Sequence, residues 1–243
     1  MALIKPNAMK KTFLFILLLN NLFTYAQNGF FLQPIVGIGA GGGSYTDINH
    51  NEYKTKLVPV YDAQLGIGYQ FSHLMINTGI GYMRTGLRYI DVGLSYTMYA
   101  TVYYNHLVVP VAFGYRFHNG KKSFITPILG VDLTYNYSGR QTAYTQAGVN
   151  WNKTMPISEP FFKSVYRPNT WFGVVQLKFD HSLTSRLNIM FMPTINYMFS
   201  NMQNYYQSKP QYPNQHNYAV LLNMGIKYTF TKSHKEEKSI QQK

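Results

Sequence analysis

The chain has 243 residues, no cysteine and a formal net charge of +13 at pH 7. The lack of cysteine excludes disulfides, thiolate chemistry and a lipid anchor on cysteine, and the scattered basic residues argue against nucleic-acid binding. No stretch reaches the roughly 18 apolar residues that a transmembrane helix needs, so a helical membrane protein is excluded. The 22 Tyr and 16 Phe are nevertheless many for a soluble domain of this length.

The first 26 residues have the pattern of a secretory signal peptide. Two lysines precede an apolar run over residues 12–23, and small residues lead up to Ala26, after which we expect cleavage. We therefore predict a signal peptide over residues 1–26 and one domain over residues 27–230. Residues 231–243 are charged and poor in apolar side chains, which predicts a disordered periplasmic tail.

Eight segments of the mature chain alternate apolar and polar residues with a period of two, as strands with one apolar face do. In chain order they cover residues 30–41, 57–71, 74–89, 100–117, 123–137, 170–180, 187–199 and 218–230. Their connections alternate strictly between long loops (44–56, 91–99, 139–169, 200–217) and short turns (72–73, 118–121, 181–185). This alternation predicts an all-β fold, an eight-stranded antiparallel up-and-down transmembrane β-barrel with both termini in the periplasm.

The last segment, residues 218–230, shows the membrane pattern most clearly. One side is wholly apolar, with aromatic residues at both ends and aliphatic residues between them, as lipid and two headgroup layers require. At about 3.3 Å per residue and a tilt of about 40°, the segment covers about 30 Å. A lone strand would leave unpaired backbone groups in hydrocarbon, so the other segments must close a barrel. A soluble lipocalin-like barrel would instead carry its charges outside.

Four of the segments end in the same way, which indicates a repeated structural role. The endings are Tyr69-Gln70-Phe71, Tyr115-Arg116-Phe117, Leu177-Lys178-Phe179 and Tyr228-Thr229-Phe230. We predict that the four phenylalanines form an aromatic girdle at the periplasmic side of the membrane. In the last segment, Asn223, Gly225, Tyr228 and Phe230 also have the spacing of the C-terminal signal that barrel-assembly machinery recognises in bacterial outer-membrane proteins. An ordinary amphipathic strand that ends in Phe is the alternative.

The interior of an eight-stranded barrel is too narrow for an aqueous channel and is filled by side chains. The predicted inward-facing polar residues are Asp62, Gln64, Arg116, Asp132, Lys178, Asp180, Asn223 and Lys227. Acids and bases are nearly balanced in this set, and a charge held away from water needs a partner. We interpret the set as a network of salt bridges and hydrogen bonds, with a gated ion path as the alternative.

Histidines at the turns and in the loops are candidate sites for chemistry. His73, His118 and His181 each follow a girdle phenylalanine or its neighbour, and without an acidic partner we interpret them as interfacial turn residues. His50 and His216 lie in outer loops, with Ser44, Asp47 and Glu52 also in outer loops, but no fixed spacing indicates a catalytic triad. We therefore expect no metal, no cofactor and no enzymatic activity.

Basic residues also stand at or beyond the predicted outer ends of the strands. They are Arg84, Arg88, Arg140, Lys163 and Arg167. The planar fork of arginine suits phosphate groups, so these residues are candidates for contact with the phosphates of lipopolysaccharide. A solvated rim without a ligand is the alternative.

Three features together resemble a known family. They are the signal peptide that ends at Ala26-Gln27, the hairpin over residues 104–136 and the terminal run GIKYTF. With these features the chain resembles the PorT-like outer-membrane β-barrel family of Bacteroidota, which implies a barrel in the outer membrane. The acidic residue that this family often carries before the proline of the fourth strand is absent, since the run here is HLVVP with Pro110 last. This departure disfavours the secretion-linked branch of the family.

Taken together, these patterns favour a monomeric, non-enzymatic outer-membrane barrel that is structural or accessory to envelope functions. Its expected partners are outer-membrane lipid, lipopolysaccharide and, during insertion, the barrel-assembly machinery. Two alternatives stay open: a PorT-type component that assists type IX protein secretion, and an outer-membrane enzyme that modifies lipid A.

Overall fold

The computed structural model describes residues 29–46, 53–92, 97–119, 122–145, 150–156, 167–200 and 214–230. The predicted signal peptide and the predicted tail lie outside these ranges. All secondary structure within them is β-strand: β1 (Gly29–Thr46), β2 (Lys54–Lys56), β3 (Val58–Phe71), β4 (Leu74–Val92), β5 (Thr97–Tyr115), β6 (Phe117–His118), β7 (Ser123–Thr145), β8 (Asn150–Pro156), β9 (Asn169–Ser182), β10 (Leu187–Met198) and β11 (Asn214–Thr229). No helix in this part of the chain is long and apolar enough to cross a membrane.

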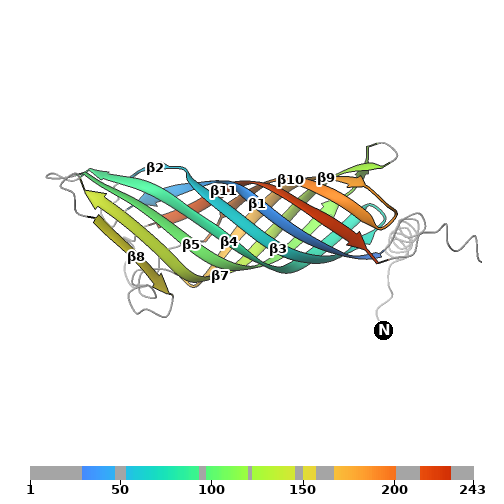
Figure 1. Cartoon of the computed structure of the whole chain (residues 1–243), viewed down its shortest axis with the longest axis horizontal. Helices are drawn as coiled ribbons and strands as arrows, with labels where there is room; N and C mark the ends of the chain where they lie inside the picture. Colours follow the sequence, from blue (N-terminus) through green and yellow to red (C-terminus); the bar gives the residue numbers. More distant parts are fainter. Residues whose placement is uncertain are drawn as a thin grey trace, which may run out of the picture.

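Eight of the strands close into a ring of antiparallel neighbours (Figure 1). The order around the ring is β1, β3, β4, β5, β7, β9, β10 and β11, and β11 returns to β1 with Leu222 opposite Ile38. Each strand of the ring therefore pairs with its neighbours in sequence, as in an up-and-down barrel. The predicted fold class is confirmed, and within the described ranges every strand of the closed ring pairs with a neighbour on both sides.

The two ends of the barrel differ in their connections. One end carries the short connections after β3, β5 and β9 together with the start of β1 and the end of β11, and we call it the turn end. The turn after β3 needs a left-handed residue, which is Ser72 with a φ of 52°. After β9, the Thr184 hydroxyl oxygen accepts hydrogen bonds from the backbone N–H groups of Arg186 and Leu187 at 3.2 and 3.0 Å. The opposite end is the loop end.

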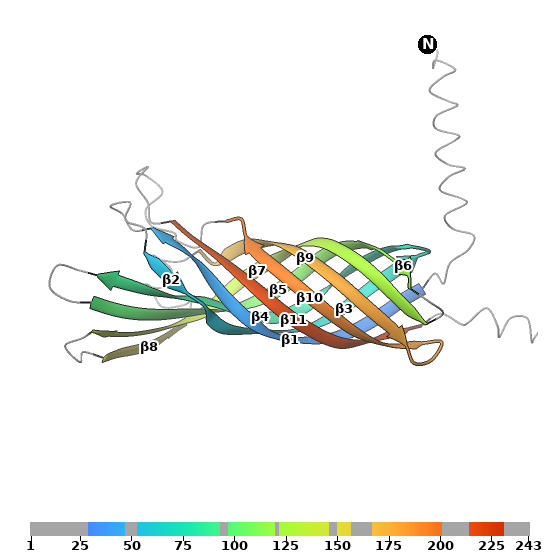
Figure 2. The ribbon, with the colours of Figure 1, turned by 90° about the horizontal axis from the view of Figure 1, so that it is seen from above.

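The strands extend further at the loop end than the sequence predicted (Figure 2). The predicted loop over residues 139–169 is wrong in part, because β7 continues to Thr145 and pairs with β8. The same holds for the loop over residues 44–56, where β2 pairs with β4, and for the loop over residues 200–217, where β11 already begins at Asn214. Backbone hydrogen bonds extend these ladders without needing an apolar face, so the hydrophobic pattern does not show where they end.

The outer surface of the barrel is apolar between two aromatic belts. Along β11, Val220, Leu222 and Met224 stay 44–55 % exposed to the outside. Near the loop end, the rings of Tyr61 and Tyr82 lie 5.7 Å apart and those of Tyr82 and Tyr137 lie 6.3 Å apart. The ten residue steps from Asn105 to Tyr115, at about 3.3 Å each and a tilt of about 40°, place the two belts about 25 Å apart. This is the height of the apolar band on membrane barrels.

The inside of the barrel is packed with side chains. Towards the loop end, Met83, Tyr104, Val108, Phe172 and Met198 form a fully buried cluster within which Phe172 also faces His106. Three smaller apolar clusters lie elsewhere on the inner faces of the strands. Polar side chains fill the space between the clusters. The interior is therefore a layered core and not a pore, as expected for eight strands.

Candidate functional site

All eight predicted inward-facing polar residues point into the barrel. Seven of them are buried and Gln64 is half-buried. They do not form one network, because the barrel separates them into two groups by charge. The basic residues Arg116, Lys178 and Lys227 lie with Asp180 near the turn end, whereas the other two aspartates lie deeper in the barrel.

The turn-end group has more cations than anions. The Asp180 carboxylate lies 3.5 Å from the Lys178 amine and 4.0 Å from the Lys227 amine, measured from the same oxygen. The Lys227 amine also donates a hydrogen bond to the Gln70 side-chain oxygen at 3.3 Å. The Lys178 amine lies 3.2 Å from the sulfur of Met75, which is a weak acceptor. One carboxylate is thus shared by two buried lysines.

Arg116 adds a third buried cation to this end. Its backbone N–H donates to the His73 carbonyl at 2.6 Å, which fixes the residue at the mouth of the barrel. The guanidinium carbon lies 3.4 Å from the centre of the Phe124 ring, a cation–π contact that holds the plane of the group. No carboxylate of the described residues lies within 4.0 Å of it, and its Nε has no hydrogen-bond partner there.

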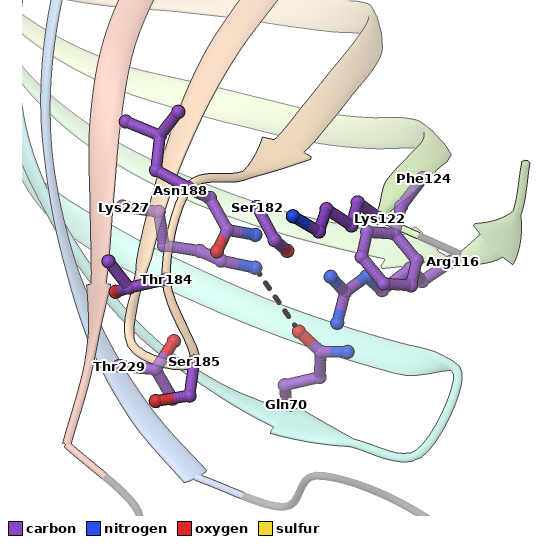
Figure 3. A pocket seen from close by; sticks show the side chains of 11 residues that line it. Gln70, Arg116, Lys122, Phe124, Ser182, Thr184, Ser185, Asn188, Lys227 and Thr229 are labelled. Atoms are coloured by element: carbon purple, nitrogen blue, oxygen red, sulfur yellow. Dashed lines mark hydrogen bonds between the residues drawn. The ribbon is translucent and has the colours of Figure 1, made fainter. Parts of the chain in front are cut away.

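A cavity of about 350 Å³ opens beside these cations at the turn end (Figure 3). Its lining consists of Gln70, Arg116, Lys122, Phe124, Ser182, Leu183, Thr184, Ser185, Asn188, Lys227 and Thr229. Arg116 directly follows β5, Lys122 precedes β7 and Lys227 belongs to β11, and Figure 3 shows the three side chains pointing towards a common space. Among the described residues that line the cavity none is acidic, while hydroxyl and amide groups surround the bases.

The two remaining aspartates lie deeper in the barrel, and no basic group of the described residues lies within 4.0 Å of either carboxylate. The Gln64 amide donates to one oxygen of Asp62 at 3.0 Å, and the other oxygen has no partner among the described residues. That free oxygen and the side-chain oxygen of Asn223 both lie over Gly37, where a missing side chain leaves room for them. Asp132 belongs to β7, and the charge of Asp62 acts on it.

The distance between the two groups prevents mutual neutralisation. In the ladder between β7 and β9, Asp132 pairs with Phe172, six residues from Lys178, or about 20 Å along the strand. With an effective dielectric constant of about 20, unit charges attract by about 0.8 kcal/mol at that distance, against about 4 kcal/mol at 4 Å. The turn end is therefore a locally positive region.

A second basic region lies outside the barrel at the loop end. The Arg84 guanidinium lies 3.9 Å from the centre of the Tyr103 ring and donates to the Tyr61 hydroxyl at 3.2 Å. On β7 a β-bulge next to Tyr137 shifts the alternation, so that Arg140 faces outward opposite Tyr103. These side chains stand at the edge of the apolar band.

The other predicted rim residues are spread around the barrel. The Arg88 Nε donates to the Thr101 hydroxyl at 3.0 Å, further along β4. Arg167 is exposed just before β9, and Lys163 lies outside the described residues. The structure thus gathers Arg84 and Arg140 around one tyrosine and leaves Arg167 apart.

Two histidines at the turns come closer together than the sequence indicated. The rings of His73 and His118 lie 6.0 Å apart, because the turns after β3 and β5 are neighbours at the turn end. The His181 ring is instead 3.0 Å from the Ser123 hydroxyl. Within the described ranges, no group of three or more histidine or acidic residues could hold a metal ion.

The loop-end residues considered for catalysis are placed only in part. Ser44 of β1 and His216 of β11 lie directly opposite each other in the ladder, with both side chains on the outer face. The His216 Nδ1 lies 3.1 Å from the Met198 carbonyl oxygen. His50, Asp47 and Glu52 lie outside the described residues.

The four repeated phenylalanines all lie on the outer surface near the turn end. Phe117 and Phe179 flank Ile125 from both sides, and the backbone N–H of Phe230 donates to the Phe30 carbonyl at 2.9 Å. The ring of Phe71 lies 4.4 Å from that of Tyr69.

The predicted insertion signal divides between the two faces of β11. Asn223 and Gly225 face inward, whereas Tyr228 and Phe230 face outward. A side chain at position 225 would meet the Pro34 carbonyl oxygen, so glycine is required for close approach of β1. Gly225 therefore has a packing role in the folded barrel in addition to its place in the predicted insertion signal.

Sequence reasoning missed most of the cavity lining. Gln70, Lys122 and Asn188 were not among the predicted site residues, although each lies within a few residues of a predicted turn. Their proximity to the turns was the available signal, because the connections at one end of a barrel converge around its mouth. The pattern of alternation cannot show which of them meet.

The distribution of polarity defines the class of the protein. An apolar outer band between aromatic belts, around a core that holds the buried charges, is the reverse of a soluble barrel and is the arrangement of an integral membrane β-barrel. No protein-family model matches the sequence, and no curated protein matches it either.

Solved structures with a similar arrangement include three barrels. Neisserial surface protein A has a TM-score of 0.40 and 12 % sequence identity, and the match covers 83 % of this chain and 97 % of that chain. The outer membrane protein OprG from Pseudomonas aeruginosa has a TM-score of 0.38 and 13 % identity, with 87 % of this chain and 99 % of that chain covered. The attachment invasion locus protein Ail of Yersinia pestis, in complex with the heparin analogue sucrose octasulfate, has a TM-score of 0.34 and 10 % identity, with 81 % of this chain and 99 % of that chain covered. At these levels the likeness concerns the fold alone.

Proposed function

We propose that the protein is a non-enzymatic barrel of the bacterial outer membrane, structural or accessory to envelope functions, that presents its loop end at the cell surface. The observation that carries this proposal is an apolar outer band around an interior filled by buried side chains such as Tyr104 and Phe172. A filled interior offers no path for a solute, so the activity of the protein belongs to its two ends. The turn end then faces the periplasm, with both termini of the mature chain.

The first experiment compares the secreted proteins of a strain that lacks this protein with those of its parent, with dye uptake as a control for leakage. Unchanged secretion in an intact envelope supports a structural or surface-binding role. Loss of secreted proteins without leakage contradicts it. Before that, membrane fractionation and faster gel migration of the unboiled protein test the location and the barrel, and a protein found in the soluble fraction would end the proposal.

The runner-up is a component that assists type IX secretion. It is supported by the resemblance of the hairpin over residues 104–136 and of the terminal run GIKYTF to the PorT-like family. In that case the turn end would contact the secretion machinery, and the strain comparison above separates the two functions.

Lipopolysaccharide is the partner that we propose for the outer rim. The support is the position of Arg84 and Arg140 beside Tyr103, at the level where the apolar band ends and phosphate groups would begin. Replacing both arginines by serine should lower the amount of lipopolysaccharide that co-purifies with the barrel. Arg186→Ser at the turn end is the matched control, and equal amounts with all variants would contradict the contact.

One observation favours a second candidate, a lipid-modifying enzyme of the rim. Ser44 and His216 are opposite each other on the outer face, and the contact of the His216 Nδ1 with the Met198 carbonyl leaves Nε2 free to act as a base. The test is mass spectrometry of lipid A from cells with the native protein or Ser44→Ala. A species that disappears with Ser44→Ala supports an enzyme, and identical lipid A excludes it.

A further inference from the structure

We propose that the cavity at the turn end is a binding site for a phosphate group. This goes beyond the proposed structural role, which assigns no ligand to this end. Three basic side chains, Arg116, Lys178 and Lys227, lie here with one acidic side chain, Asp180, and all four are at most 6 % exposed. Buried charges require compensation, since an unpaired ion costs several kcal/mol even after the protein relaxes.

Compensation does not come from elsewhere in the barrel. The mid-barrel aspartate Asp132 is about 20 Å from Lys178 along the ladder, too far to act as a partner. Asp62 is eight residues from Gln70 on β3 and thus further still from the cavity. An anion in the cavity would supply the missing charge where the cations are.

The cavity is built to receive an anion with several oxygens. The Arg116 guanidinium is aimed by the Phe124 ring and has an Nε without a partner among the described residues, although the residue is 94 % buried. The Lys227 amine reaches the same space from the side opposite Arg116, and the exposed Lys122 also lines it. Three cations from three different strands or turns therefore converge on one point (Figure 3).

The uncharged lining adds further donors to this centre. Hydroxyl groups of the β9–β10 turn and the amides of Gln70 and Asn188 surround the bases. A tetrahedral phosphate offers oxygens in several directions, which matches donors on all sides, whereas a carboxylate offers only two oxygens in one plane. A volume of about 350 Å³ is enough for one phosphate group and the atoms next to it, and it falls at the lower end of the range of ligand sites.

Two sources could deliver this chemistry: a free phosphate or phosphate ester, and the headgroup of a phospholipid in the adjoining leaflet. The experiment measures binding of inorganic phosphate to the folded barrel in an uncharged detergent by calorimetry, with chloride at equal ionic strength as the blank. A second arm adds phosphatidylglycerol to the micelles and asks whether it displaces the phosphate. Displacement assigns the site to a headgroup, and binding without displacement assigns it to a soluble phosphate.

Variants decide whether the binding is at this cavity. Arg116→Gln should weaken phosphate binding about tenfold or more, because it removes a charge-assisted contact. Lys122 is exposed, so Lys122→Gln should leave the fold intact and weaken phosphate binding by a smaller factor. Arg167→Gln, exposed at the loop end, is the matched control and should leave binding unchanged. Faster gel migration without boiling confirms that each variant is folded.

The proposal is overturned by either of two results. One is no phosphate binding by the native barrel at millimolar concentration beyond the chloride blank, as expected if the buried lysines are uncharged. The other is phosphate binding by Lys122→Gln and Arg116→Gln that is as strong as phosphate binding by Arg167→Gln. That result would place the phosphate site elsewhere on the surface.

Discussion

The position of Leu222 gives the sharpest test of how the barrel sits in a bilayer. Its side chain points outward, six residues from Tyr228 and four from Tyr218, or about 15 and 10 Å from the two aromatic ends of β11. Leu222→Lys would place a charge near the middle of the apolar band, where lysine costs about 2–4 kcal/mol. A loss of about 3 kcal/mol lowers the folding equilibrium constant about 150-fold.

The assay is urea unfolding of the purified barrel in phospholipid vesicles, with the unboiled gel shift as the measure of folded protein. Leu183→Lys is the control, because Leu183 is also an exposed leucine but belongs to the turn after β9, outside the band. It should cost at most about 1 kcal/mol. If the two lysines shifted the urea midpoint equally, position 222 would not face lipid and the assignment of the outer band would be wrong.

Three further predictions concern the interior. Gly37→Ala should destabilise the barrel by about 1–3 kcal/mol, read as a lower urea midpoint, because the new methyl group would collide with the Asp62 carboxylate. Asp180→Asn should lower the free energy of unfolding by about 3–5 kcal/mol, because it leaves two buried lysines without their shared carboxylate. Asp62 has no such cation, so Asp62→Asn should be neutral or stabilising in the same assay. Phe172→Ala should cost about 3–5 kcal/mol by opening a cavity in the core, and Trp171→Ala on the outer face should cost less.

Each of these predictions has an outcome that contradicts it. Gly66→Ala is the control for the first, since the atoms nearest to its methyl group belong to the Gln33 side chain and lie 2.9 Å or more away, and an equal loss would refute the collision. A loss at position 62 as large as that at position 180 would show that the mid-barrel aspartates have a partner. Equal losses at positions 171 and 172 would mean that the interior is not packed as described.

The sequence predicted the barrel itself because alternation and connection length are local properties. Each stretch such as residues 218–230 displays its apolar face without reference to any other strand, and the short turns identify neighbouring strands. The extension of β7 to Thr145 was not predictable in this way. Its added residues are mostly polar or glycine, apart from Ala143 and Tyr144, and are held by the ladders with β5 and β8.

The candidate site was predictable only as a set of inward residues. The alternation indicated that Arg116, Lys227 and Asp132 face inward, but their heights depend on the stagger between strands around the ring. The prediction of a balanced network assumed that residues of opposite charge would meet. The repeated endings do place Arg116 and Lys178 at one level near the turns, but which acidic side chains meet them depends on the stagger around the ring and could not be inferred from one strand at a time.

The extended β7–β8 hairpin has a consequence for what can reach the protein from outside. From Tyr137 at the aromatic belt to Thr145, eight residues rise about 20 Å along the barrel axis. The headgroup layer on one side of a bilayer is only about 5–8 Å thick. The end of β7 therefore stands well beyond the headgroup layer, so a bulky molecule in solution can contact it without touching the membrane.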